Sequence, residues 1–115
     1  MQYMLLIYGD ERATESASRE LTNEIINAYM AYSQALSDAK VAVASNRLRP
    51  TSAATTVRIA DGRTKVLDGP FAETKEQLGG YYLIDVPDLD AALSWASRCP
   101  GARYGTVEVR PIWVM

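Results

Sequence analysis

Acid–base and nucleophilic chemistry in this 115-residue chain has to come from a short set of residue types. The chain has no histidine and a single cysteine, Cys99. These counts exclude Ser-His-Asp and Cys-His catalysis, histidine acid–base catalysis and nearly every transition-metal site. The remaining candidates are Asp, Glu, Lys, Arg and Tyr side chains and the backbone.

The first candidate for such chemistry is the segment Asp68-Gly69-Pro70-Phe71. These residue types are typical of a turn, in which Asp68 hydrogen-bonds its own backbone, Gly69 takes an unusual φ and Phe71 enters the core. In the alternative interpretation, Asp68 is a ligand-binding carboxylate, or a catalytic general acid or base, at the mouth of a cleft. The charge cluster over residues 73–76 either forms solvated surface or faces that cleft.

A predicted β-hairpin directly before this segment carries basic residues on one face. Asp61-Gly62 is a strong two-residue turn signal, and it pairs Arg58 with Lys65 across the two strands. Like charges opposite each other destabilise a hairpin unless an acidic group, an anionic ligand or solvent accompanies them. We therefore hypothesise a mixed-charge site that holds an anionic group of a small ligand and consists of Arg58, Lys65, Asp68 and Glu73. The alternative is that both basic side chains extend into water.

No motif for a nucleotide cofactor or a metal is present. The glycine-rich patterns of phosphate and dinucleotide loops are both absent, so we expect no cofactor. The segment around Asp85, Asp88 and Asp90 lacks the glycine and the terminal glutamate of an EF-hand calcium loop. Asp88 is better explained as a helix N-cap. We expect no metal site. Cys99 has no basic neighbour in the sequence that would lower its pKa, so we interpret it as a packing residue.

Hydrophobic periodicity predicts the elements that must position these residues. Residues 2–8 are apolar on both faces, as expected of a central strand. Residues 15–39 carry one uninterrupted helical stripe. The predicted order is strand 2–8, helix 15–39, strand 40–48, hairpin 55–67, strand 80–86, helix 88–99 and strand 105–114. Thr74-Lys75-Glu76-Gln77 has the form of a capping box, but at most one or two helical turns fit before Gly79-Gly80. Without the hairpin, this order of elements is the βαββαβ pattern of a ferredoxin-like α+β fold.

The composition and charge predict one globular domain over residues 1–115. Twelve basic and fourteen acidic residues give a formal net charge of −2. This balance is atypical of a generic nucleic-acid binder or a polybasic membrane-surface binder. The N-terminal apolar run lacks a basic region and a cleavage site, and it is too short to span a membrane. We therefore expect a cytoplasmic protein.

Residues 68–80 read Asp-Gly-Pro-Phe-Ala-Glu-Thr-Lys-Glu-Gln-Leu-Gly-Gly, and this segment resembles the hallmark of the YCII-related proteins that carry a DGPF motif. Residues 54–58 and 105–111 are similar to the same family. The resemblance implies a ferredoxin-like domain of the dimeric α+β barrel type. The wider group includes a dehydrochlorinase with a proposed catalytic His-Asp pair, a mechanism that a chain without histidine cannot use. Some relatives are encoded beside extracytoplasmic-function sigma factors, which implies a regulatory role.

Three functions are consistent with these sequence features. One is a ligand-binding module that takes a small organic molecule in a cleft of the dimer and acts with a sigma factor. The alternative is a histidine-independent lyase or isomerase that uses Asp/Glu acid–base chemistry. The third is a purely structural interaction domain. The missing histidine disfavours the enzyme, and the polar residues of the motif disfavour the structural domain.

The predicted sheet has one face that its own helices cannot cover. A four-stranded sheet with two helices covers a single face. Because strand 2–8 is apolar on both faces, its second face needs a partner. We predict a homodimer formed through this open face.

Overall fold

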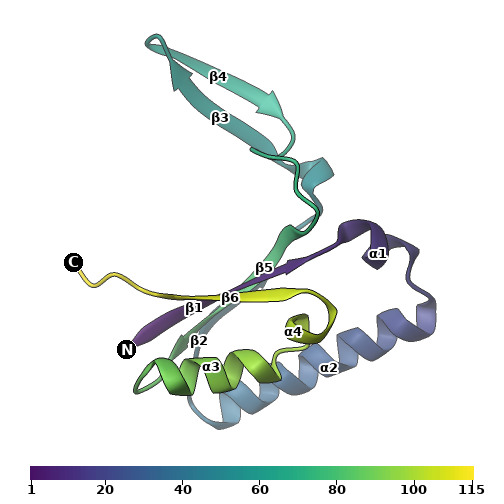
Figure 1. Ribbon diagram of the computed structural model, residues 1–115, viewed down its shortest axis with the longest axis vertical. Coiled ribbons are helices and arrows are strands. Elements are labelled where there is room, and N and C mark those ends of the chain that lie inside the picture. The colour runs from purple at the N-terminus through teal and green to yellow at the C-terminus, as the bar shows by residue number, and fades with distance from the viewer.

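The computed structural model describes residues 1–115 as a four-stranded antiparallel sheet with helices on one face and a separate β-hairpin (Figure 1). The strand order in the sheet is β2-β5-β1-β6, which is the arrangement of a ferredoxin-like fold. The predicted α+β fold with an inserted hairpin is therefore confirmed. The elements are β1 (Gln2–Gly9), α1 (Glu11–Ser16), α2 (Arg19–Asp38), β2 (Ala42–Arg47), η1 (Thr51–Ala53), β3 (Thr55–Ala60), β4 (Arg63–Asp68), β5 (Gln77–Asp85), α3 (Leu89–Arg98), α4 (Gly101–Tyr104) and β6 (Thr106–Pro111).

Strand β1 lies inside the sheet between β5 and β6, as its two apolar faces predict. Tyr3 and Leu5 point toward the helices and are buried in the core, where they join Tyr32 and Leu36 of α2 and residues of β5 and α3. The alternate residues of β1 point to the other face, which no helix covers (Figure 1). The core is thus one layer between sheet and helices.

The expected helix over residues 15–39 is two helices, and the prediction of one continuous element was wrong. Ala17 and Ser18 have extended backbone angles between α1 and α2. The Ser18 side chain accepts a hydrogen bond from the Leu21 N–H at 3.1 Å, so Ser18 caps α2 and stops α1 from running into it. No helix of the structure is both long and apolar enough to cross a membrane.

The hairpin has the predicted register. Arg58 is paired with Lys65, and the flanking pairs follow the Asp61-Gly62 turn. Asp61 and Gly62 have φ values of 53° and 72°, the conformation that this type of turn requires. The turn residues alone therefore determined which side chains lie opposite each other.

The segment between β4 and β5 has no helix, so the capping-box pattern at Thr74 does not begin a helical turn. The Thr74 hydroxyl donates to the Glu76 carbonyl, and the Gln77 amide donates to the Thr74 carbonyl. These side chains hydrogen-bond the backbone locally, in competition with helical hydrogen bonds. Gln77 already belongs to β5, which begins earlier than expected. The sequence pattern also missed the single-turn helix α4, and it extended the last strand beyond Pro111, where β6 ends.

Candidate functional site

A polar pocket of about 340 Å³ lies where the loop after β4 meets the start of α1 and η1. Its volume is within the range of small-molecule sites, which is about 300–1,000 Å³. Three elements and one loop contribute to its walls, so residues from distant parts of the chain meet here. The lining residues are Glu11, Arg12, Thr51, Ser52, Gly69, Pro70, Ala72, Glu73, Thr74 and Gln77.

Glu11 ties the walls of this polar pocket together. One of its carboxylate oxygens accepts from the Thr51 N–H at 2.8 Å, and the other accepts from the Thr51 hydroxyl at 2.7 Å. The Glu11 N–H in turn donates to the Gln77 side-chain oxygen at 2.9 Å. The ends of α1, η1 and β5 are therefore held in one hydrogen-bonded unit, and both oxygens of the Glu11 carboxylate have a partner.

Gly69 fixes the loop that forms the opposite wall. Its N–H donates to the Ala54 carbonyl at 2.7 Å, and its carbonyl accepts from the Thr56 hydroxyl at 2.7 Å. Its φ is +111°, in the region that favours glycine, which confirms the predicted turn role of this residue. The loop therefore leaves the hairpin in one fixed direction and runs along the pocket.

Arg12 and Glu73 supply the charges of the pocket that have no partner in the chain. The single ion pair of the structure joins the Met1 amino group to Asp85, at the ends of β1 and β5 that lie away from this pocket. A guanidinium group binds anionic oxygens through two parallel N–H donors. A carboxylate accepts a hydrogen bond or a proton from a hydroxyl group. The pocket thus presents a donor and an acceptor suited to a small molecule that carries both an anionic oxygen and a hydroxyl group.

The four residues of the hypothesised mixed-charge site are not joined by any ion pair. Arg58 and Lys65 lie opposite each other on one face of the hairpin, whereas Asp68 pairs with Thr55 and belongs to the other face. Glu73 lines the polar pocket. The structure therefore brings Arg58 and Lys65 together, and separately places Glu73 beside the Gly69 loop. The ligand-binding role of all four residues stays a prediction.

Phe71 does not enter the core, so that part of the turn interpretation was wrong. Its side chain is 77% exposed. The Arg58 guanidinium lies 5.6 Å from the centre of its ring, which is a cation–π distance. Part of the charge that the hairpin places at Arg58 is thus accommodated by an aromatic ring rather than by a carboxylate.

Sequence reasoning missed Glu11, Arg12 and Thr51. Arg12 follows the strand that the sequence identified, but nothing local indicates that η1 and the loop after β4 fold against it. The contact between residues about 40 positions apart depends on the tertiary fold. The signal that could have pointed to Glu11 is the Gly9-Asp10 strand end, after which Asp10 caps α1 by accepting from the Arg12 N–H.

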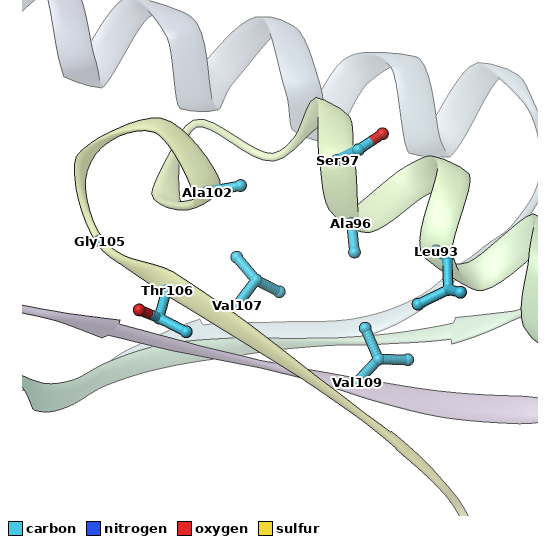
Figure 2. A pocket seen from close by; sticks show the side chains of 8 residues that line it. All are labelled: Leu93, Ala96, Ser97, Ala102, Gly105, Thr106, Val107 and Val109. Atoms are coloured by element: carbon cyan, nitrogen blue, oxygen red, sulfur yellow. The ribbon is translucent and has the colours of Figure 1, made fainter.

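A second pocket of about 280 Å³ lies between α3, α4 and the edge strand β6. Figure 2 shows the side chains of Leu93, Val107 and Val109 directed toward its interior. None of its lining residues is titratable. Acid–base chemistry is therefore confined to other parts of the molecule.

The buried tyrosines form the other cluster of titratable groups. The Tyr32 hydroxyl donates to the Trp95 carbonyl at 2.7 Å, and the Tyr82 hydroxyl is 2.8 Å from that of Ser33. Burial raises the pKa of Tyr29, Tyr32 and Tyr82 above their ordinary values. Burial also raises the pKa of the Cys99 thiol, which is 2% exposed. Cys99 is thus a packing residue, as expected, because its thiolate is disfavoured.

The YCII-related domain profile matches residues 1–115. The chain belongs to the YCII-related family. It is 43% identical over 114 residues to an uncharacterized protein of Rhizobium meliloti (strain 1021), covering 97% of this chain and 92% of that relative. Membership of the family and the ferredoxin-like fold therefore agree with the resemblance found in the sequence.

A solved structure of similar fold is the 5-chloro-2-hydroxyhydroquinone dehydrochlorinase from Burkholderia phenoliruptrix AC1100, in complex with 2,5-dihydroxybenzoquinone. The TM-score is 0.59 at 10% sequence identity, and the match covers 98% of this chain and 94% of the dehydrochlorinase. At this identity the comparison establishes the shared fold.

Proposed function

We propose that this YCII-related protein binds a small hydroxylated organic anion in the polar pocket. The observation that carries the proposal is that Arg12 and Glu73, neither of which has an ion-pair partner, line one pocket whose walls are held by Glu11 and Gly69. The guanidinium of Arg12 binds the anionic oxygen and the carboxylate of Glu73 accepts from a hydroxyl. The Asp68-Gly69-Pro70-Phe71 motif supports placing the chain in the DGPF subgroup, and Gly69 builds the pocket wall.

We propose in addition that the binding unit is a cytoplasmic homodimer. The supporting surface is the open sheet face, which is the side of the four-stranded sheet opposite the helices and carries Met4, Leu6, Tyr8, Tyr81 and Leu83. Glu108 and Arg110 of β6 lie beside these residues, so the face has an apolar centre with a charged edge. An apolar patch with a polar rim typically marks an interaction surface. A second copy packed on this face gives each copy a second covered side.

Ligand binding should appear as thermal stabilisation by 2,5-dihydroxybenzoquinone or by small hydroxybenzoates. A ligand at about 100 times its Kd stabilises the native state by about 2.7 kcal/mol. For a domain of this size, that corresponds to a rise in melting temperature of about 10 °C. Differential scanning fluorimetry of the wild type, Arg12→Ala and Arg19→Ala measures it. The Arg19 variant is the control, because it removes an exposed arginine that lies outside the pocket.

We expect the ligand to raise the melting temperature of the wild type and of Arg19→Ala, and to leave that of Arg12→Ala unchanged. No rise with any probe would contradict the proposal. An equal rise in all three proteins would show that the pocket is not the binding site.

The second candidate function is a histidine-independent lyase, favoured by the activity of the structural neighbour. A dehydrochlorination needs a base that removes a proton while chloride leaves with the bonding electron pair. Asp68 and Glu73 are the carboxylates assigned to this role, since Glu11 is engaged with Thr51. Without turnover, ligand binding alone fits a regulatory role beside an extracytoplasmic-function sigma factor.

Chloride release from 5-chloro-2-hydroxyhydroquinone separates these two functions. If the protein is a lyase, an ion-selective electrode will record release above the buffer rate for the wild type. Asp68→Asn or Glu73→Gln should then lower that rate by about 100-fold, the typical contribution of a general base. Binding of the quinone without chloride release would exclude the lyase for this substrate.

A further inference from the structure

The β3–β4 hairpin is a two-stranded sheet that does not pair with the main sheet. It projects from the side of the sheet that the helices leave uncovered, and it is joined to the body through η1 and the loop after β4 (Figure 1). No hydrogen bond connects its strands to the four-stranded sheet. An isolated two-stranded hairpin is at best marginally stable in water. A long hairpin in this position therefore needs a surface to pack on.

The two faces of the hairpin differ in character. Val57, Ile59 and Val66 form an apolar stripe on one face, and their side chains are 60–73% exposed. Arg58, Arg63 and Lys65 lie on the other face, together with Leu67 near its end. This alternation is typical of a hairpin with one covered and one solvated side. The apolar stripe is the side that requires a cover.

The open sheet face is a surface of matching character on the same chain. Its centre, formed by β1 and β5, is apolar, and Glu108 and Arg110 of β6 flank that centre on one side. The face lies on the side from which the hairpin projects, and no element of the chain covers it (Figure 1). Strands of six residues are about 20 Å long, and four strands spaced about 4.8 Å apart span about 15–20 Å. The hairpin is thus long enough to cross the sheet. Because it stands away from its own sheet, the sheet that it can cross belongs to another copy.

We propose that the hairpin is an arm that packs on a second copy of the chain, with Val57, Ile59 and Val66 lying against the open sheet face of that copy. The arrangement rests on the proposed dimer, and two-fold symmetry exchanges two arms. The basic face of each arm then points to solvent. Since the pocket loop begins at Asp68, where the arm ends, a docked arm holds the loop of the polar pocket in place.

Hydrogen–deuterium exchange of the wild type at two protein concentrations tests the arm directly. The dimer dissociation constant is first measured by analytical ultracentrifugation, and exchange is then recorded about tenfold above and tenfold below it. We expect the amides of residues 55–68 to be protected at the higher concentration and to lose protection at the lower one. Amides of α2, which lies on the opposite side of the sheet, serve as the internal reference for folded chain.

A matched pair of variants identifies the face that makes the contact. Ile59→Asp places a charge in the apolar stripe, and Arg63→Asp places the same residue on the basic face of the same hairpin. We expect Ile59→Asp to raise the dimer dissociation constant by about tenfold or more, because a large apolar side chain loses its burial. We expect Arg63→Asp to leave it within about threefold of the wild type.

Each alternative result has a defined consequence. A stable dimer whose hairpin amides exchange freely overturns the arm and leaves the dimer and the ligand site intact. A chain that stays monomeric overturns both the arm and the dimer. It does not decide ligand binding in the polar pocket, which the thermal-stabilisation experiment tests on its own. Protection of the hairpin amides at every concentration would place the contact within the hairpin's own subunit and would overturn the arm. Equal effects of the two variants on the dimer dissociation constant would show that the apolar stripe is not the contacting face, and would overturn it as well. If Ile59→Asp does not fold, the exchange experiment on the wild type decides.

Discussion

Replacing Gly105 with alanine should lower the free energy of unfolding by about 3 kcal/mol or more, or prevent folding. The Cβ added there would overlap the Tyr8 carbonyl oxygen and would lie 3.1 Å from the Gly9 Cα. Both atoms belong to the backbone of β1, which the core and two neighbouring strands hold in place. Because the backbone cannot move aside as a flexible side chain would, the chain has to separate β6 from β1. Overpacking of this kind typically costs 1–3 kcal/mol and occasionally more.

Gly79→Ala is the control for this experiment. The Cβ at position 79 would meet only the Ile7 carbonyl oxygen, at an ordinary contact distance of 3.8 Å. We expect its free energy of unfolding to stay within about 1 kcal/mol of the wild type. Urea titrations followed by circular dichroism compare the three proteins. Similar unfolding midpoints for the wild type and Gly105→Ala would contradict the close approach of Gly105, between α4 and β6, to the backbone of β1.

Raising the pH above about 9 should progressively destabilise the protein. The folded-state pKa values of Tyr29, Tyr32, Tyr82 and Cys99 are raised by burial. Below the unfolded-state values, about 8.5 for Cys and 10 for Tyr, both states hold these protons and stability is unaffected. Above them, the unfolded chain ionises while the folded chain stays protonated, so stability is lost as the pH rises toward the folded-state values. Each such group contributes a slope of about 1.4 kcal/mol per pH unit.

Tyr29→Phe tests the origin of this pH dependence. It removes one of the four titrating groups and keeps the aromatic ring. Because the unfolded tyrosine is about half ionised at pH 10, the loss of stability between pH 10 and pH 11 should become smaller by about 1 kcal/mol. Free energies of unfolding from urea titrations at pH 8, 9, 10 and 11 measure the slope for both proteins. A wild type of constant stability across this range would show that the tyrosine cluster is accessible to water in the native state.

Local sequence patterns predicted the elements that short-range chemistry controls. Asp61-Gly62 determined the hairpin register because only residues tolerant of positive φ complete that turn. Asp88 was identified as a helix cap, and its carboxylate accepts from the Ala91 N–H at 2.9 Å. The errors also have local causes. Ser18 was one of several possible caps inside an apolar stripe, and the side chains of Thr74 and Gln77 hydrogen-bonded the backbone of their own loop.

The candidate site was predicted only in part, because its residues come from three separate parts of the chain. The sequence identified the Asp68-Gly69-Pro70-Phe71 turn and Glu73. The conformation of this short segment depends on residues close to it in the chain. It did not identify Arg12 or the contact between Glu11 and Thr51, because these require β1 and β2 to lie in one sheet with β5 between them. It also grouped Asp68 with Arg58 and Lys65, whereas strand alternation places Asp68 on the opposite face.

The amino-acid sequence by itself determined the family, the ferredoxin-like order of elements, the hairpin register and the absence of histidine chemistry. Each of these depends on residue types or on spacing within a few positions. The tertiary structure decided that Phe71 is exposed, that Glu11 and Arg12 face the loop after β4, and that the hairpin stands apart from the sheet. These features depend on contacts between residues that are far apart in the chain, and their free energies are set by burial and geometry that no local pattern encodes.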